Sequence, residues 1–271
     1  MKIAVVSTSK GSGATFIATN FAHSCSINYI DLNLPAFGST LFKGEKIDTL
    51  KAVWHTENLT ESLCEDCDKC ANACAKKCYL KTEEDISLFC KGCPSGKCTL
   101  SCEKQLLNGK EEQIGEIFVE KYEKIKVLSL NTREENLSAV CECAVDYLQG
   151  ENAILDMPES TTPQFITALK LCDYCVIVTE GSSFDFEQFK AIIRLCKLTA
   201  KPYGVIINKL LTHYDKLTDY CNLHSTDVLA KIPYNKRDER IILSGEIISK
   251  VKFSYKQYFT SALQVIKKKI K

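Results

Sequence analysis

The stretch KIAVVSTSKGSGAT, residues 2–15, decides the fold of the chain. Its β-branched run Lys2–Ser7 predicts a buried strand, which leads through a glycine-rich turn directly into an apolar helical pattern. In a working phosphate-binding loop, backbone amides surround the phosphates, a lysine reaches the β- and γ-phosphates, and a Ser or Thr hydroxyl holds magnesium. Most of these elements are present here as Gly11, Ser12, Gly13 and Thr15. The lysine position, however, is Ala14.

Apolar runs and helical patterns alternate along the rest of the chain. Strands are predicted at 28–32, 126–130, 153–156, 174–180, 203–209 and 227–232, and helices at 134–148, 184–198 and 254–270. Strands that alternate with helices of this kind need a parallel sheet with right-handed crossovers. We therefore predict an α/β protein built on a parallel sheet. The stretches 49–60 and 108–126 are expected to connect this sheet to an insertion, with Gly109 and Gly115 at turns.

Two aspartates, Asp31 and Asp156, stand at the ends of predicted strands. Ligands of open α/β sheets bind at the carboxyl ends of the strands, so a carboxylate there is well placed for a metal ion or water. The run ILDMP at 154–158 also has the form of a Walker B strand, whose aspartate orients magnesium through water. The alternative for both aspartates is a cap on the following turn.

Eight of the sixteen cysteines lie between residues 64 and 102, in two closely spaced runs. The first run is Cys64, Cys67, Cys70 and Cys74, and the second is Cys90, Cys93, Cys98 and Cys102. In bacterial two-cluster ferredoxins the fourth cysteine of one run ligates the cluster of the other. This logic predicts one 4Fe-4S cluster on Cys64, Cys67, Cys70 and Cys102 and a second on Cys74, Cys90, Cys93 and Cys98. Zinc and disulfides remain as alternatives, although zinc ribbons need no third cysteine and disulfides need an oxidising compartment.

The other eight cysteines are expected to be core residues, because a free cysteine behaves as a small apolar side chain. They are Cys25, Cys78, Cys141, Cys143, Cys172, Cys175, Cys196 and Cys221. Cys172 and Cys175 have the spacing of a ligand pair, but they lead from a helix end into a buried strand.

The bulk composition narrows the class of protein. The 271 residues suffice for one α/β domain with a short inserted subdomain. Thirty-five basic against 34 acidic residues give a net charge of +1, which predicts no nucleic-acid-binding surface. The N-terminus matches neither a secretory signal nor a membrane span, so a cytoplasmic protein is expected. The lysine-rich helix at 254–270 is expected to pack on the sheet, with binding to a membrane surface as the less simple alternative.

Five stretches together resemble the MinD/ParA-type P-loop ATPases that carry an inserted two-cluster ferredoxin domain. They are TSKGSGAT (8–15), YIDLNLPAFGSTLF (29–42), ILDMPEST (154–161), IVTEGSSF (177–184) and IINK (206–209). The resemblance covers essentially the whole chain. It implies an ATPase-like domain made of residues 1–58 and 109–271, interrupted by a bacterial-ferredoxin-like iron–sulfur subdomain at 59–108.

The resemblance also implies roles for single residues. Gly11, Gly13 and Thr15 would belong to the phosphate loop, Asp31 to the switch after the second strand, Asp156 to Walker B, and Asn208 to adenine recognition. The signature lysine of the family, which reaches across a dimer, falls on Ser9 in an ungapped alignment and on Lys10 after a one-residue deletion. Ala14 replaces the other lysine of the loop in both registers.

Without an ammonium group at position 14, the charge on a transferred phosphoryl group lacks a major stabiliser, so we expect hydrolysis to be weak or absent. Our leading hypothesis is an iron–sulfur protein that presents two 4Fe-4S clusters for electron transfer or cluster handling. It would act with a redox partner protein and as a dimer, either with a second copy or with an intact MinD-like paralogue. The alternative is an active ATPase that uses ATP, magnesium and Lys10 or a partner lysine to drive cluster reduction or transfer.

Overall fold

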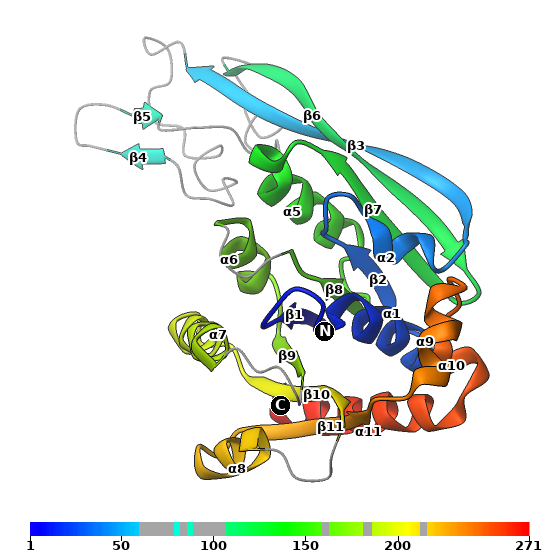
Figure 1. Ribbon diagram of the computed structural model, residues 1–271. Coiled ribbons are helices and arrows are strands. Elements are labelled where there is room, and N and C mark those ends of the chain that lie inside the picture. Colours follow the sequence, from blue (N-terminus) through cyan, green and yellow to red (C-terminus); the bar gives the residue numbers. More distant parts are fainter. Residues whose placement is uncertain are drawn as a thin grey trace.

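The structure, a computed structural model, describes residues 1–59, 79–81, 86–88, 107–158, 163–180, 186–211 and 216–270 (Figure 1). Its strands are β1 (Lys2–Ser7), β2 (Asn28–Asp31), β3 (Glu45–Leu59), β4 (Tyr79–Lys81), β5 (Ile86–Leu88), β6 (Leu107–Tyr122), β7 (Ile125–Thr132), β8 (Ala153–Asp156), β9 (Tyr174–Glu180), β10 (Tyr203–Leu210) and β11 (Asp227–Pro233). Nine of these form one sheet in the order β11-β10-β9-β1-β8-β2-β7-β6-β3, while β4 and β5 pair separately.

The centre of the large sheet is parallel, as predicted. The pairs β1/β8, β1/β9, β2/β8, β2/β7, β9/β10 and β10/β11 all run in the same direction. The strands expected from the apolar runs are confirmed within one or two residues at each end. β1 lies near the middle of the sheet, so the loop that follows it opens at the shared carboxyl edge of the parallel strands.

Helices cover both faces of the sheet. They are α1 (Ala14–Cys25), α2 (Phe37–Thr40), α5 (Leu137–Tyr147), α6 (Pro163–Lys170), α7 (Phe186–Leu198), α8 (Lys216–Leu223), α9 (Lys236–Leu243), α10 (Ile248–Val251) and α11 (Phe253–Ile270). One core cluster joins the sheet to α5, α6, α7 and α8, and the other joins it to α1, α10 and α11. The predicted α/β protein thus has its sheet between two layers of helices, with a core on each face.

The helix α11 packs on the sheet. Tyr255, Phe259 and Ile266 are buried, and Phe259 stacks on Phe21 of α1 with ring centroids 5.4 Å apart. The apolar positions thus face a core, and Lys267, Lys268 and Lys269 of the last turn are exposed. In the described part of the chain, no helix is both long and apolar enough to cross a membrane.

Most of the cysteines outside the two runs are core residues, as expected. Those that are buried are Cys141, Cys172, Cys175, Cys196 and Cys221. Cys25 and Cys143 are half-buried, and Cys78 lies outside the described residues. Cys172 donates to the carbonyl oxygen of Ala168 at 3.2 Å, which is a helix-end contact rather than a ligand geometry.

The prediction of turns at Gly109 and Gly115 is wrong, and no strand was predicted at 49–60 or 108–126. β3 and β6 form a long antiparallel ribbon that extends from the edge of the sheet (Figure 1), so the sheet is mixed rather than wholly parallel. Gly109 and Gly115 lie inside β6 instead of at turns. The ribbon was not predicted because its sequence is rich in charged residues, several of them exposed at 45–51, whereas parallel strands buried on both faces are continuously apolar.

The ribbon fixes where the intervening segment leaves and returns. Glu45 pairs with Lys121 at one end, and Leu59 pairs with Leu107 at the other. Residues 59 and 107 therefore lie opposite each other. The eight cysteines of the two runs lie between them in sequence and fall outside the described residues.

The packing of α11 generates a stability prediction. Replacing the fully buried Phe259 with alanine removes a stacked ring, and we expect the free energy of unfolding to fall by about 3–5 kcal/mol. Phe253, at the start of the same helix, is 70% exposed. Phe253→Ala should therefore change the free energy of unfolding by less than about 0.5 kcal/mol. Denaturant unfolding of the two variants and the parent compares them, and equal losses would contradict the assigned orientation of the helix.

Candidate functional site

The loop between β1 and α1 is tied together by its own serines. The Ser9 amide donates to Ser7 Oγ at 3.1 Å, Ser7 Oγ lies 2.8 Å from Ser12 Oγ, and the Ser12 amide donates to the Ser9 carbonyl at 3.1 Å. Gly11 and Gly13 have φ values of 89° and 88°, in the left-handed region that favours glycine. The turn can therefore double back tightly before α1 begins at Ala14.

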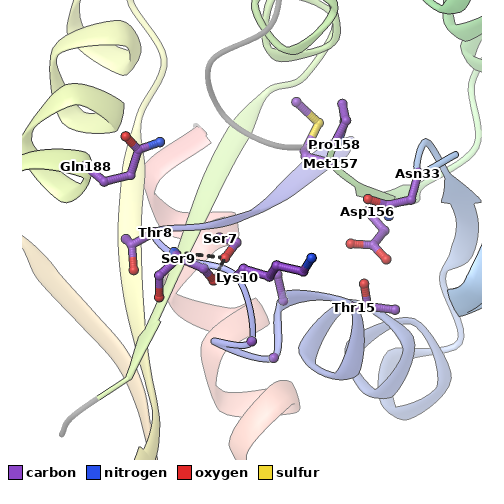
Figure 2. A pocket seen from close by; sticks show the side chains of 13 residues that line it. Ser7, Thr8, Ser9, Lys10, Thr15, Asn33, Asp156, Met157, Pro158 and Gln188 are labelled. Atoms are coloured by element: carbon purple, nitrogen blue, oxygen red, sulfur yellow. Dashed lines mark hydrogen bonds between the residues drawn. The ribbon is translucent and has the colours of Figure 1, made fainter. Parts of the chain in front are cut away.

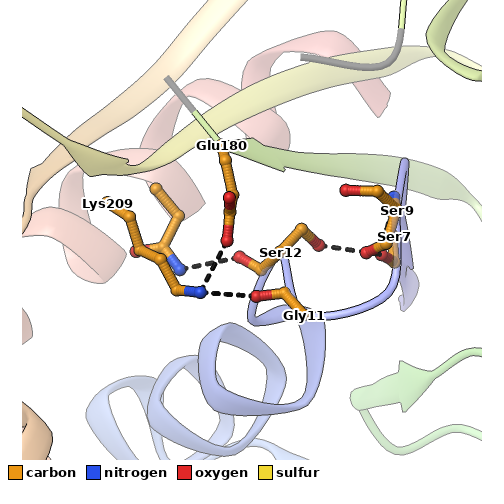
Figure 3. Close-up of polar contacts among 7 residues, drawn as sticks. Ser7, Ser9, Gly11, Ser12, Glu180 and Lys209 are labelled. Atoms are coloured by element: carbon orange, nitrogen blue, oxygen red, sulfur yellow. Dashed lines mark hydrogen bonds and ion pairs between the residues drawn. The ribbon is translucent and has the colours of Figure 1, made fainter. Parts of the chain in front are cut away.

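Two neighbouring strands anchor this loop from outside (Figure 3). At the end of β10, Asn208 Nδ2 donates to the Ser12 carbonyl at 2.9 Å, and Lys209 Nζ donates to the Gly11 carbonyl at 2.6 Å. Lys209 Nζ also lies 2.5 Å from Oε1 of Glu180 at the end of β9. A Cβ atom at Gly13 would lie 2.5 Å from Asn208 Nδ2, so this contact itself requires glycine.

A cavity of about 560 Å³ opens between the loop and the end of β8 (Figure 2). It is lined by residues that sequence analysis singled out, namely Lys10, Gly11, Gly13, Thr15 and Asp156, together with Ala14. In Figure 2 the Lys10 side chain runs along the loop toward the side of the cavity on which Asp156 lies. Ser12 is fully buried, and its hydroxyl contacts Ser7 Oγ instead of lining the cavity.

Both predicted aspartates are buried side by side at this edge. Asp31 and Asp156 are opposite residues in the parallel pairing of β2 with β8, and neither has any exposed surface. Asp31 Oδ2 accepts the Ser39 amide at 2.8 Å, and its Oδ1 accepts the amide and Nδ2 of Asn33, each at 3.1 Å. The capping alternative thus describes one part of the role of Asp31, since it holds the turn that leads into α2.

Asp156 is satisfied on one oxygen only. Its Oδ2 accepts the Tyr29 hydroxyl at 2.8 Å. Its Oδ1 is buried and has no hydrogen-bond partner of ordinary geometry among the described residues. A buried carboxylate oxygen without a donor is costly unless something else binds it.

Burial shifts the proton equilibria of both aspartates. It raises the pKa of Asp156 to about 7, and the neighbouring charge of Asp31 acts in the same direction. The polar side chains of Thr15, Tyr29 and Asn33 oppose this rise in pKa. Burial also raises the pKa of Asp31, against the hydrogen bonds from Ser39 and Asn33. Two carboxylates held this close favour a cation between or beside them.

This donor set fits a magnesium ion with a phosphate group. The free Asp156 Oδ1 and the nearby Thr15 supply hard oxygen ligands. The glycine-rich turn and the first turn of α1 supply backbone amides for an anion. Among the described residues that line the cavity, Lys10 is the only one with a cationic side chain, because position 14 is alanine.

A second cavity of about 270 Å³ lies on the other side of the loop. It is lined by Phe16, Asn208, Pro233 and Tyr255, with Asp238 among its polar residues. The Tyr255 hydroxyl donates to Asp238 Oδ2 at 2.7 Å, and Lys252 pairs with the other oxygen. Asn208, expected at an adenine site, thus stands between this cavity and the loop.

Sequence reasoning missed several residues of the site. Glu180 and Lys209 are the last residues of two predicted strands, 174–180 and 203–209, so their position was a usable signal. Tyr29 gave none, because a tyrosine within an apolar strand is typical of a core residue. No group of three or more Cys, His, Asp or Glu side chains suited to a metal ion occurs in the described ranges, which exclude the two cysteine runs.

The raised pKa of Asp156 predicts a pH-dependent stability. Between about pH 4 and pH 7 the folded chain keeps a proton on Asp156 that the unfolded chain has released, so stability falls as the pH rises through this window. Relative to Asp156→Asn, the free energy of unfolding of the parent should fall by up to about 4 kcal/mol between about pH 4 and pH 7 and then stay constant. Magnesium-free denaturant unfolding of both chains at about pH 5, 6, 7 and 8 measures this difference. Parallel pH profiles would show that the carboxyl group is ionised throughout.

Comparison with known proteins places the fold. No family model matches the chain, and no curated protein sequence matches it. Solved structures do match. The septum site-determining protein MinD from Pyrococcus horikoshii, solved with Mg-ADP, is 14% identical with a TM-score of 0.58, over 97% of this chain and 95% of that one.

Two further structures agree. A ParA family ATPase from Chlorobium tepidum is 16% identical with a TM-score of 0.55, over 97% of each chain. MinD in a MinC:MinD cell division complex from Aquifex aeolicus is 15% identical with a TM-score of 0.54, over 98% of this chain and 95% of that one. At such identities the likeness concerns the fold alone, and it confirms the resemblance at that level: this chain has the fold of the MinD/ParA P-loop ATPases.

Proposed function

We propose that this protein binds a magnesium nucleotide at its β1–α1 loop and carries two 4Fe-4S clusters in the segment between β3 and β6, acting in electron transfer or cluster handling. The observation that carries the nucleotide half is the buried, unpartnered Oδ1 of Asp156, which lies at a cavity beside a glycine-rich loop and Thr15. A buried carboxylate oxygen that accepts no hydrogen bond is well suited to bind a cation such as magnesium.

The nucleotide would be ATP or ADP, with magnesium held by Thr15 and Asp156. Asp31, fixed by the Ser39 amide, stands next to Asp156 and places a second negative charge near the metal. The amides of the loop would bind the phosphates, and the base would enter the second cavity beside Asn208. The related MinD structure with Mg-ADP supports this ligand class for the fold.

Hydrolysis would be slow because Ala14 leaves the phosphates without the usual lysine of the loop. Lys209 does not replace it, since its Nζ is engaged by the Gly11 carbonyl and by Glu180. We therefore infer that the degenerate loop holds nucleotide as a bound ligand rather than as a rapidly consumed substrate.

The iron–sulfur half of the proposal rests on the two cysteine runs and on the ribbon. Because Leu59 pairs with Leu107, the two ends of the intervening segment lie next to each other, as expected for an inserted unit. We infer a ferredoxin-like insertion at 59–108 between two parts of a P-loop domain, 1–58 and 109–271. The β4/β5 hairpin lies in sequence between the two cysteine runs.

The proposed partners follow from the incomplete loop and from the two clusters. A chain with an incomplete loop would pair with a second copy or with an intact paralogue, and its clusters would exchange electrons with a redox protein. The MinC:MinD complex illustrates that a protein of this fold binds a partner. We infer a cytoplasmic protein without nucleic-acid binding, in keeping with its net charge of +1.

Anaerobic purification tests both halves on one sample. We expect about eight iron and eight sulfide per chain, since each of two clusters holds four of each, together with nucleotide that binds more weakly when magnesium is removed. Cys64→Ser should lower the iron content, whereas Cys25→Ser, at a half-buried position outside the runs, should leave it unchanged. A colourless protein with stoichiometric zinc would overturn the cluster assignment, and lack of ATP binding at millimolar concentration would overturn the nucleotide assignment.

A second candidate function is an active ATPase that couples hydrolysis to cluster reduction or transfer. The observation that favours it is the position of Lys10, which lines the same cavity as Thr15 and Asp156. An ammonium group there could neutralise a phosphoryl group that Ala14 cannot reach.

Lys10→Ala separates the two candidates. If Lys10 serves catalysis, kcat should fall by about 100-fold or more. We expect instead that ATP hydrolysis is near background in the parent and unchanged in the variant, while the affinity for ATP falls because a cation near the phosphates is lost. Lys124→Ala, at an exposed lysine away from the cavity, is the matched control. Steady-state hydrolysis and equilibrium binding measured on the same preparations give both quantities.

A further inference from the structure

Tyr29 is an unusual neighbour for the aspartate at the end of β8. It lies in β2, has no exposed surface, and its hydroxyl donates to Asp156 Oδ2 at 2.8 Å. A buried tyrosine usually finds some hydrogen-bond partner, but a core position alone does not require a partner that belongs to a ligand site.

The direction of this hydrogen bond decides which carboxylate oxygen is available. The phenol donates to Oδ2, so the carboxylate plane is fixed from behind and Oδ1 is left without a partner among the described residues. Donors of this kind orient metal-binding carboxylates and are often as important for metal affinity as the ligands themselves.

The packing around Tyr29 leaves its hydroxyl little freedom. The ring contacts Phe42 with centroids 5.0 Å apart. On the other side lies Gly38 of α2, where an added Cβ would come within 1.9 Å of the hydroxyl oxygen and 2.8 Å of Thr15 Cγ2. The next residue, Ser39, donates its amide to Asp31. The segment that holds Asp31 therefore also closes over the Tyr29 hydroxyl.

We propose that Tyr29 is a positioning residue for magnesium, whose hydroxyl holds Asp156 so that Oδ1 faces the metal of the bound nucleotide. This inference rests on the proposed nucleotide site and adds to it a residue that does not touch the ligand. Gly38 contributes by leaving room for the hydroxyl, so a side chain at that position would disturb the metal site from α2.

Tyr174 provides a matched control within the same core cluster. It lies in β9, is also fully buried, and its hydroxyl has no hydrogen-bond partner among the described residues. Tyr29→Phe and Tyr174→Phe thus remove the same atom from two buried rings, and only the first removes a donor to Asp156.

The experiment measures ADP binding to the full-length, anaerobically prepared chain, first without magnesium and then with magnesium titrated in. We expect Tyr29→Phe to weaken magnesium binding to the ADP-loaded protein by about 10–100-fold and to leave magnesium-free ADP affinity nearly unchanged. Tyr174→Phe should behave as the parent in both measurements. In an Asp156→Asn background, Tyr29→Phe should have no further effect on magnesium.

The possible results separate the inference from the function on which it rests. If the parent binds Mg-ADP and Tyr29→Phe binds magnesium equally well, the positioning role is wrong and the nucleotide site stands. If the parent shows no magnesium-dependent ADP binding, the proposed nucleotide site fails and the inference fails with it. Should Tyr29→Phe not fold, Gly38→Ala is used instead, because its Cβ must displace the hydroxyl; unchanged magnesium affinity there overturns the role equally.

Discussion

The central physical constraint in this molecule is the burial of two carboxylates at neighbouring positions. The pairing of β2 with β8 sets Asp31 opposite Asp156, and both are removed from water. Two adjacent negative charges in a poorly polarisable interior are strongly unfavourable without compensation. The surrounding polar groups provide part of it: Asn33 and Ser39 donate to Asp31, and Tyr29 donates to Asp156. The side chains of Thr15 and Asn33 also stabilise the charged form of Asp156. Its buried Oδ1 still has no hydrogen-bond partner of ordinary geometry among the described residues, and the proposed function is argued from this oxygen.

The same strands connect this site to the antiparallel ribbon. β2 pairs with β7 on the side away from β8, and β7 pairs with β6, which holds the end of the cysteine-containing segment. A third cavity lies between the turn at Leu34–Ser39 and the strands β6 and β7. A change in the turn that holds Asp31 would therefore meet the base of the ribbon directly. The strand β2, which ends at Asp31, is thus connected to the ribbon through β7.

Sequence reasoning was successful where the physical signal was local. The parallel strands are short, apolar and bounded by turns, so their positions could be predicted, and the strand-end aspartates followed from the rule that parallel strands share one ligand-binding edge. It failed at β3 and β6, because exposed charged residues interrupt any continuous apolar run and no short turn joins these two strands, although Glu123 and Lys124 form a short turn from β6 into β7. It also missed Tyr29 and Gly38. Their relation depends on one hydroxyl and one absent Cβ meeting across the fold, which no spacing in the chain encodes.

Position 14 of the loop is alanine, so the charges of the neighbouring residues decide how the loop would interact with an anion. Lys209, the last residue but one of β10, contacts Glu180 and the Gly11 carbonyl through its Nζ. Within the described lining of the cavity only Lys10 is cationic and only Asp156 is acidic, and the buried Asp31 lies beside Asp156. A nucleotide without a metal would therefore meet more negative than positive charge. Magnesium would have to supply most of the attraction, because it is the one component able to neutralise Asp156 and the phosphates together. A site of this kind would favour the metal complex over the free nucleotide more strongly than a loop with its lysine does.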